Sequence, residues 1–197
     1  GVPLDNVEIR IDNPDENGIG EVIAKGDNIM HGYYDNEEAT AAVLRDGWFH
    51  TGDLGYIDKS GYLFLSGRKK NVIVLKNGKN VFPEELEAEI SALPYQMENI
   101  VVGLPKNGDD RDLVVALKIV YDPEQFAGMS KEEIEKRIHE DVEKINDRMP
   151  LYKHIKRIFV TDEPMIKTST SKVRRFLEIE KMLEEEKKDG GTHGKQI

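Results

Sequence analysis

The order of apolar and polar residues predicts short strands in the first part of the chain. Residues 6–11 alternate polar and apolar side chains, residues 20–25 do so less strictly, and a turn-rich stretch with Pro, Asp and Gly separates them. Asp35 or Asn36 can cap a short helix that carries glutamates in its first turn, where negative charge is favourable. A hairpin is expected over residues 55–65. This part of the chain is therefore predicted to be strand-dominated.

After residue 67 the pattern changes to strands that alternate with helices. Pro83 stands where the first turn of a helix tolerates proline, and Ser130 with Glu133 forms a capping box ahead of apolar residues at helical spacing. Strands are expected at residues 72–75, 100–104, 112–120 and 155–160, and helices at 83–90, 131–147 and 173–187.

The fold class predicted from these elements is α+β, with a sheet and flanking helices in the second part. We expect a β-rich piece at residues 1–66, a small α+β domain at 67–188 and a disordered tail at 189–197. The chain starts at Gly1, not at a methionine, and has no signal-peptide pattern there. We therefore expect it to be a piece of a longer protein, the β-rich part being the end of a larger domain.

Composition narrows the classes of function. The chain has 197 residues and no cysteine, and its formal net charge is −10. It therefore has no disulfide framework or thiolate nucleophile, and the expected location is the cytoplasm. An acidic chain is a poor general nucleic-acid binder, and its apolar runs are too short to span a membrane. The histidines lack ligand spacing, so no metal site is expected, and no serine-hydrolase or phosphate-loop motif is present.

Two polar segments near the change of pattern have alternative interpretations. Thr51-Gly52-Asp53 follows an aromatic stretch, so Asp53 either accepts hydrogen bonds from a vicinal diol such as a ribose or forms an Asx-type turn. Residues 67–71 read GRKKN. They suit a bending linker in which Arg68 reaches an anion or hydroxyl, and equally a solvated charge run.

Two segments of the second part also combine charge with turn residues. Residues 76–80, KNGKN, are either a simple hairpin turn or a place where Gly78 lets the backbone approach a narrow ligand. Residues 164–175 gather lysines, arginines and hydroxyl residues in an otherwise acidic chain. They read either as a loop that delivers one lysine to a phosphate or carboxylate, or as the basic flank of an acidic helix.

Taken in order, these segments resemble the AMP-forming acyl-CoA synthetases of the adenylate-forming superfamily. Residues 48–55, WFHTGDLG, are similar to the family's W-x-x-T-G-D-x-G motif, and residues 67–74 to its linker. Residues 77–87 resemble the G-x-x-I-x-P-x-E-I-E stretch, and residues 167–175 resemble the closing K-T-x-x-G-K-x-x-R. The resemblance covers the C-terminal portion of such an enzyme, whose phosphate loop and adenine motif lie upstream.

The resemblance implies roles for individual residues. Asp53 would bind the ribose hydroxyls of ATP or AMP with Arg68 nearby, and Lys70 would be the hinge position. Lys172 would enter the site in one pose of the small domain and help join the acyl carboxylate to the α-phosphate. In the other pose Lys76, Asn77 and Gly78 would line the pantetheine tunnel of CoA.

Two departures from the family pattern carry further expectations. Ser171 stands where many members have glycine, which leaves Lys172 assigned but bears on the flexibility of its loop. Lys70 stands where short-chain members usually carry aspartate, and the loop at 75–78 looks one residue longer. Both resemble the long-chain fatty-acid–CoA ligase branch.

The resemblance therefore implies a fragment of a ligase that converts fatty acid, ATP and CoA to acyl-CoA, AMP and diphosphate, and that is inactive or nearly so alone. Its implied partners are these small molecules, Mg²⁺ bound with ATP by residues outside this chain, its own upstream domain, and a peripheral membrane surface. Two alternatives remain. One is an acyl-adenylating enzyme that transfers to a carrier protein or amine, and the other is a non-catalytic binding module with the small-domain fold.

Overall fold

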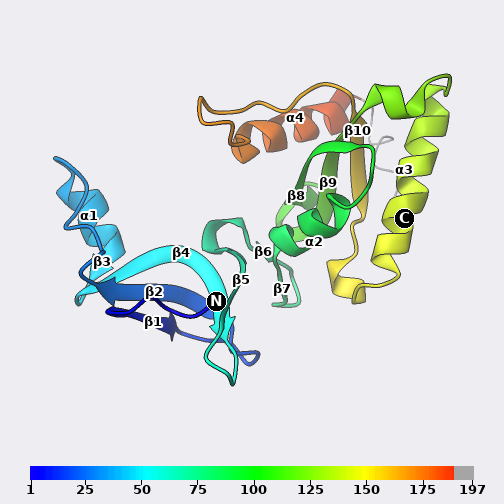
Figure 1. Ribbon diagram of the computed structural model, residues 1–197. Helices are drawn as coiled ribbons and strands as arrows, with labels where there is room; N and C mark the ends of the chain where they lie inside the picture. The colour runs from blue at the N-terminus through cyan, green and yellow to red at the C-terminus, as the bar shows by residue number, and fades with distance from the viewer. Residues whose placement is uncertain (189–197) are drawn as a thin grey trace. The chain divides into compact units, whose positions relative to one another are not determined.

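The structure is a computed structural model that describes residues 1–188 (Figure 1). The chain divides into two compact units, Gly1–Val72 and Ile73–Ile197. We call them unit 1 and unit 2 and describe each by itself. The division lies a few residues beyond the boundary expected at residue 66. The tail expected at residues 189–197 lies outside the described residues.

Unit 1 is built on one antiparallel sheet in the order β1-β2-β4-β3, with β5 paired to β4. The predicted short helix is present as α1, and the Asn36 side chain accepts a hydrogen bond from Ala39 N as its N-cap. The predicted hairpin is also present, because the Asp58 carboxylate accepts hydrogen bonds from Ser60 N and Tyr62 N in the turn. The elements of unit 1 are β1 Val7–Asp12, β2 Gly20–Gly26, α1 Glu37–Val43, β3 Leu44–Arg45, β4 Trp48–Ile57, β5 Leu63–Arg68 and the 3₁₀ helix η1 Lys69–Asn71.

The segment Thr51-Gly52-Asp53 is a bulge inside β4 and not a turn between two elements. Glu21 of β2 pairs with Leu54 and the strand pairing resumes at Ile23 with His50, so three residues of β4 stand opposite one of β2. Gly52 takes a φ of 72°, which favours glycine. The ladder to β2 continues on both sides of the bulge.

Unit 2 is built on a three-stranded sheet in the order β10-β9-β8. β8 and β9 are antiparallel, and β9 and β10 are parallel. Helices cover both faces, with α3 and α4 on opposite sides of the sheet (Figure 1). The elements are β6 Ile73–Val74, β7 Asn80–Val81, α2 Pro83–Ile90, β8 Gln96–Lys106, β9 Asp109–Tyr121, η2 Pro123–Phe126, α3 Lys131–Asn146, η3 Leu151–Lys153, β10 Arg157–Thr161 and α4 Arg175–Lys188.

Alternate residues of β9 build the two cores of unit 2. Leu117 and Ile119 pack into the cluster shared with α2 and α3, whereas Ala116 and Val120 pack into the cluster shared with α4. The two-residue period of a strand requires this division. Lys118 follows the same period and points to the α4 side, where its side chain is only 6% exposed. The α4 side of the sheet therefore contains a buried charge.

The helix predicted from the capping box is confirmed as α3. Ser130 and Glu133 make both hydrogen bonds of the box, and Ile138 and Val142 are fully buried on the apolar face. The helix ends at Asn146, earlier than expected, because the Asn146 side chain turns back to bond both the N–H and the C=O of Ile155. This amide fixes the approach of the chain to β10.

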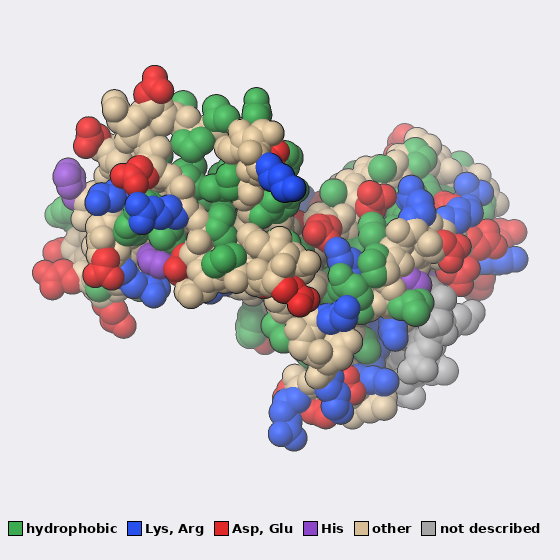
Figure 2. All heavy atoms as spheres, turned by 90° about the horizontal axis from the view of Figure 1, so that it is seen from below, with side chains coloured by type: hydrophobic (Ala, Val, Ile, Leu, Met, Phe, Trp, Pro, Cys, Tyr) green, Lys and Arg blue, Asp and Glu red, His purple; other side chains and the backbone are tan. Residues whose placement is uncertain are grey.

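The surface mixes charges of both signs. On the face shown in Figure 2, Lys and Arg side chains are interspersed with Asp and Glu side chains. Among residues 1–188, each helix is too short or too polar to cross a bilayer.

Candidate functional site

Asp53 on β4 and Arg68 at the end of β5 form an ion pair that is open to ligands. They are partners across the β4–β5 ladder, and Arg68 Nε lies 2.7 Å from Asp53 Oδ1. The Arg68 side chain is 53% exposed and the Asp53 side chain is 29% exposed. A hollow beside the pair is lined by Gly52, Arg68, Lys69 and Lys70. Since a carboxylate has acceptor capacity beyond one guanidinium bond, Asp53 can also accept hydrogen bonds from hydroxyl groups of a ligand.

Glu21 on β2 lies behind this pair and is nearly buried, with 8% of its side chain exposed. Its Oε1 accepts a hydrogen bond from Gly52 N at 3.1 Å. Its Oε2 lies 2.9 Å from Lys69 Nζ and 3.2 Å from His50 Nδ1. Burial acts to raise the pKa of Glu21, but the hydrogen bonds from Lys69, His50 and Gly52 outweigh it and hold that pKa below its usual value. Glu21 is therefore a charged carboxylate with several donors around it.

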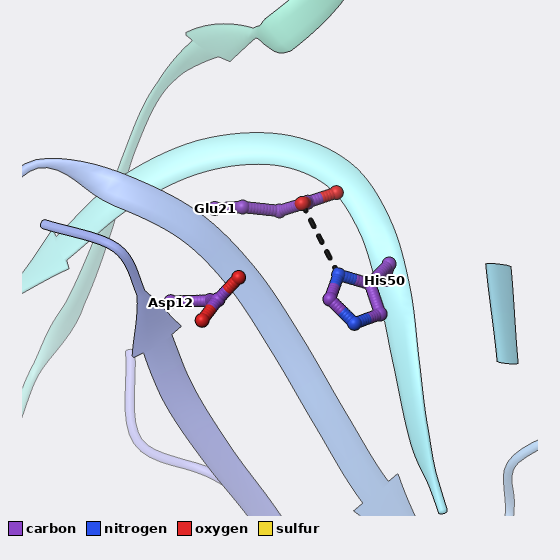
Figure 3. Close-up of side chains that lie close together, drawn as sticks. All are labelled: Asp12, Glu21 and His50. Atoms are coloured by element: carbon purple, nitrogen blue, oxygen red, sulfur yellow. Dashed lines mark hydrogen bonds and ion pairs between the residues drawn. The ribbon is translucent and has the colours of Figure 1, made fainter. Parts of the chain in front are cut away.

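Asp12 brings a second carboxylate close to Glu21 and His50. Figure 3 shows the three side chains converging from the end of β1, the start of β2 and the first residues of β4. One potential ligand atom from each lies within 4.8 Å of the others, a spacing at which three such groups can hold a metal ion. Asp12 already accepts a hydrogen bond from Asn13 Nδ2, and Glu21 already bonds the Lys69 ammonium. A metal ion would have to displace that ammonium.

Lys70, the position expected to be the hinge, lies in η1 directly after β5. Its side chain is exposed. The division between the two units follows at Val72 and Ile73. Lys70 thus lies close to the place where the chain passes from one unit to the other.

The segment expected to line the CoA tunnel is a tight turn between β6 and β7. Gly78 N donates to Leu75 O at 2.8 Å, and Leu75 N donates to Lys79 O at 2.9 Å. Gly78 has a φ of 78°. The Asn77 side chain accepts a hydrogen bond from Lys79 N, and Lys76 points its ammonium to within 3.6 Å of an Asp112 oxygen. All three predicted residues are exposed.

A hollow of about 220 Å³ lies beside this turn within unit 2. Its lining includes Lys76, Asn77 and the aromatic ring of Tyr152, over which Lys79 Nζ lies at 4.6 Å. Further cationic or titratable side chains also line it, namely Lys106, His154 and Lys156. The hollow therefore combines an aromatic face with three lysines, of which Lys76 is paired with the Asp112 carboxylate that also lines it.

Lys172 lies in a hydrogen-bonded hairpin and not in an irregular loop. Lys167 and Val173 form an antiparallel bridge, Thr168 N donates to Lys172 O at 2.8 Å, and Ser171 N donates to Thr168 O at 3.0 Å. The Thr168 hydroxyl also accepts from Lys172 N. Ser171 has a φ of 60°, in the left-handed region that favours glycine. Lys172 directly precedes the bridge residue Val173, and its side chain is exposed.

The start of the hairpin is fixed from inside unit 2 by Glu178, which is fully buried on α4. Its Oε1 accepts a hydrogen bond from Ile166 N at 2.7 Å, and its Oε2 lies 2.8 Å from Lys118 Nζ. Burial acts to raise the pKa of Glu178, but the Ile166 amide and Lys118 hold it below its usual value. A buried ion pair therefore holds the strand that leads to Lys172.

Two exposed or half-buried ion pairs hold the hairpin, one to the edge strand β8 and one to α2. Lys167 Nζ lies 2.7 Å from Glu98 Oε1. After the hairpin, Arg175 Nη2 contacts both carboxylate oxygens of Glu87 at 2.5 and 2.7 Å, and its Nη1 donates to Val101 O at 2.9 Å. Through these two nitrogens Arg175 connects the start of α4 both to Glu87 of α2 and to the backbone of β8.

The predicted residues fall into three groups. Asp53 and Arg68 are brought together in unit 1. In unit 2, the turn at Lys76–Gly78 belongs to β6 and β7, whose Ile73 and Val81 pack in the cluster shared with α2 and α3. The Lys172 hairpin leads into α4, and its Val173 packs on the opposite cluster. The two candidate segments of unit 2 thus belong to opposite sides of its sheet.

The sequence analysis assigned no role to three acidic residues that organise these segments. They are Glu21, Glu87 and Glu178. Glu178 lies among other acidic residues of a helix expected to be charged and solvated, so only its apolar surroundings in the fold distinguish it. A glutamate in an otherwise apolar strand was the one available signal for Glu21.

Comparison with known proteins gives a consistent family. The model of the AMP-binding enzyme C-terminal domain matches residues 70–186. A putative acyl-CoA ligase of Bacillus subtilis is 40% identical over 111 residues, 53% of this chain and 22% of the relative. The long-chain-fatty-acid–CoA ligase FadD15 of Mycobacterium tuberculosis is 41% identical over 128 residues, 65% of this chain and 20% of the relative. A 2-succinylbenzoate–CoA ligase of Bacillus velezensis is 36% identical over 144 residues, 69% of this chain and 29% of the relative.

Solved structures agree with the sequence relatives. ATP-bound MatB from Rhodopseudomonas palustris has a TM-score of 0.71 at 29% identity, covering 92% of this chain and 35% of that one. O-succinylbenzoate CoA synthetase from Bacillus subtilis in complex with AMP also has a TM-score of 0.71 at 29% identity, covering 89% and 34%. The chain spans about a fifth to a third of the length of these proteins. It belongs to the AMP-binding enzyme C-terminal domain family of the adenylate-forming enzymes.

Proposed function

We propose that this chain acts as the C-terminal part of an ATP- and CoA-dependent acyl-CoA ligase that uses long-chain fatty acids. In the first step a carboxylate oxygen of the fatty acid attacks the α-phosphorus of ATP, and diphosphate leaves. In the second step the CoA thiol attacks the acyl carbonyl, and AMP leaves. The observation that carries the proposal is the placement of Lys172 and the Lys76–Gly78 turn on opposite sides of one small sheet.

Lys172 serves the first step. The attacking carboxylate and the α-phosphate are both anions and repel each other, so an ammonium between them stabilises the transition state. One such electrostatic contact in a water-poor site contributes about 2.7–4 kcal/mol. The hydrogen-bonded hairpin supports this role, because it fixes the backbone of Lys172 through Thr168 while the side chain stays exposed.

The Lys76–Gly78 turn serves the second step. Thioester formation needs the Lys172 ammonium withdrawn and a narrow path opened for the pantetheine arm of CoA. Gly78 carries no side chain that would obstruct this path, and the neighbouring hollow offers positive charges for an anionic ligand. Unit 2 would change from one step to the other by rotating about Lys70, which lies close to the division between the units.

Asp53 and Arg68 bind the nucleotide in this proposal. The free acceptor capacity of Asp53 suits the two ribose hydroxyls of ATP or AMP, and the contact with Arg68 orients the carboxylate. Mg²⁺ accompanies ATP, with ligands in the upstream domain. Structures similar to this chain were solved with ATP or AMP, which supports the nucleotide assignment.

The long-chain substrate rests on Lys70 and on the loop at residues 75–78. The curated relatives carry the names of ligases for long-chain fatty acids, 2-succinylbenzoate, ferulate and indoleacetate, so they support the reaction class more broadly than the chain length. We further propose that the enzyme works in the cytoplasm and contacts membranes peripherally to reach its substrate. Its remaining partner is its own upstream domain.

The test is reassembly of the enzyme from this chain and the separately expressed upstream domain. Palmitate-dependent release of diphosphate and formation of palmitoyl-CoA are measured with the upstream domain alone and with the chain added. The proposal expects both activities to appear only with the chain, and palmitate to be used more efficiently than 2-succinylbenzoate. Reassembly without either activity would overturn the ligase assignment, and a preference for 2-succinylbenzoate would overturn the long-chain assignment.

A further inference from the structure

Glu21 bonds both sequence neighbours of the Asp53–Arg68 pair. Gly52, whose N–H donates to Glu21 Oε1, directly precedes Asp53. Lys69, whose ammonium bonds Glu21 Oε2, directly follows Arg68. One carboxylate on β2 thus connects the bulge of β4 to the first residue of η1.

The bulge needs such a support. In a regular ladder the N–H of each β4 residue facing β2 would find a backbone carbonyl, but β2 offers only one residue opposite residues 51–53. Val22 O is taken by the Thr51 hydroxyl at 2.7 Å, and Asp53 N donates to the same hydroxyl at 3.0 Å. The N–H of Gly52 therefore depends on the Glu21 side chain. An unsatisfied N–H here would allow the bulge to relax and move Asp53.

The other oxygen of Glu21 acts on the opposite side of the ion pair. Lys69 is 62% exposed, yet its ammonium is drawn down to a carboxylate that is 8% exposed. This contact ties the residue that directly follows Arg68 to β2. His50 Nδ1, at 3.2 Å from the same oxygen, limits the rotation of the carboxylate.

We propose that Glu21 is a positioning residue for recognition of the ribose hydroxyls. It touches no substrate and acts by fixing Asp53 and Arg68 relative to each other. The inference rests on the proposed function, in which Asp53 accepts hydrogen bonds from the ribose. It also accounts for the cluster of Asp12, Glu21 and His50 without a metal ion, since the Lys69 ammonium supplies the positive charge that a buried carboxylate requires.

The test compares two nucleotides on the reassembled enzyme. The dissociation constants of AMP and of 2′,3′-dideoxy-AMP are measured by calorimetry for the wild type and for Glu21→Gln. The variant keeps an acceptor for Gly52 N but loses the charge that holds Lys69. We expect it to bind AMP about tenfold more weakly, the loss of one charged hydrogen bond of about 1.4 kcal/mol. It should bind the dideoxy nucleotide within about twofold of the wild type, because that ligand cannot use Asp53.

Two further variants control for folding and for charge. Lys69→Met keeps the length of an exposed side chain and removes only the ammonium, so it should fold. It should bind AMP about threefold more weakly, as expected for the loss of a partly exposed charge contact, and bind the dideoxy nucleotide unchanged. Glu8→Gln neutralises a carboxylate on β1 that is 62% exposed and should change neither constant. Far-ultraviolet circular dichroism and the amide spectrum of the 197-residue chain verify folding.

The outcomes separate the inference from the function on which it rests. If the wild type binds both nucleotides equally, Asp53 does not recognise the ribose, and the nucleotide assignment is overturned together with the inference. If the wild type prefers AMP but Glu21→Gln loses affinity for both nucleotides by the same factor, Glu21 has a general structural role and the inference alone is wrong. If Glu21→Gln does not fold, Lys69→Met provides the test instead. A Lys69→Met variant that binds AMP and the dideoxy nucleotide as the wild type does would contradict the inference.

Discussion

Removing the lysine of the buried Lys118–Glu178 pair should strongly destabilise unit 2. The two side chains are 6% and 0% exposed and their charged atoms lie 2.8 Å apart. Lys118→Met preserves the shape of the stem but leaves the Glu178 carboxylate buried with only the Ile166 amide as a donor. Breaking one partner of a buried pair costs about 3–5 kcal/mol. This is a large share of the roughly 5–15 kcal/mol that stabilises a domain.

Urea unfolding measures this loss within the intact chain. The helices α2, α3 and α4 belong to unit 2, so circular dichroism at 222 nm reports mainly on that unit. The chain's single tryptophan, Trp48, lies in unit 1 and reports on that unit by fluorescence. With a slope of about 2 kcal/mol per molar urea, Lys118→Met should lower the dichroism midpoint by roughly 2 M. The fluorescence midpoint should not move.

A double variant and a surface control test the reasoning. Adding Glu178→Gln to Lys118→Met removes the unpaired charge while retaining an acceptor for Ile166 N, so it should recover at least about 2 kcal/mol. Lys136→Met breaks an exposed pair on α3, with 78% and 49% exposed side chains, and should cost less than about 0.5 kcal/mol. A loss in Lys118→Met no larger than in Lys136→Met, or a double variant less stable than the single one, would refute the reasoning.

Three further predictions concern the same region. Ser171→Gly should relieve a left-handed backbone strain of about 1–2 kcal/mol and lose about 0.4–1 kcal/mol through the freer unfolded chain, so urea unfolding should show a net gain of about 0.5 kcal/mol. The pKa of Glu178 is below its usual value in the folded state, so the carboxylate stabilises the fold at pH values above the ordinary carboxyl pKa, and this stabilisation is lost as the pH falls from there through the folded-state pKa. The urea midpoint should therefore drop less between pH 7 and pH 3 in Glu178→Gln than in the wild type. Arg175→Lys should lose the bond to Val101 O that the guanidinium makes beside its contact to Glu87, and adenylation should slow about tenfold at unchanged CoA affinity, measured by diphosphate release.

Elements with local causes could be predicted from the sequence. The capping box at Ser130 and Glu133 defines the start of α3 from residues within one turn, and the turn after Asp58 defines the β4–β5 hairpin in the same way. The order of strands and helices in unit 2 also agrees with the predicted one. These signals lie within a few residues of the feature they specify.

The supports of the candidate sites depend on residues that are far apart in the chain. Glu21 meets His50 and Lys69 only after β2 and β4 pair, at separations of 29 and 48 residues. Arg175 and Glu87 are 88 residues apart. A residue pattern that reads as a free loop at 164–175 therefore became a fixed hairpin, because its partners come from other elements. Sequence motifs indicated which residues could do chemistry, and only the fold shows what holds them.

The most direct test of the account separates the two half-reactions of the reassembled enzyme carrying Lys172→Ala. Diphosphate release from palmitate and ATP reports on the first, and palmitoyl-CoA formation from supplied palmitoyl-adenylate reports on the second; Lys136→Ala on α3 is the matched control. The account predicts a loss of at least about 100-fold in the first half-reaction, the equivalent of 2.7 kcal/mol, and a second half-reaction within about twofold of the wild type. Equal loss of both half-reactions would contradict it.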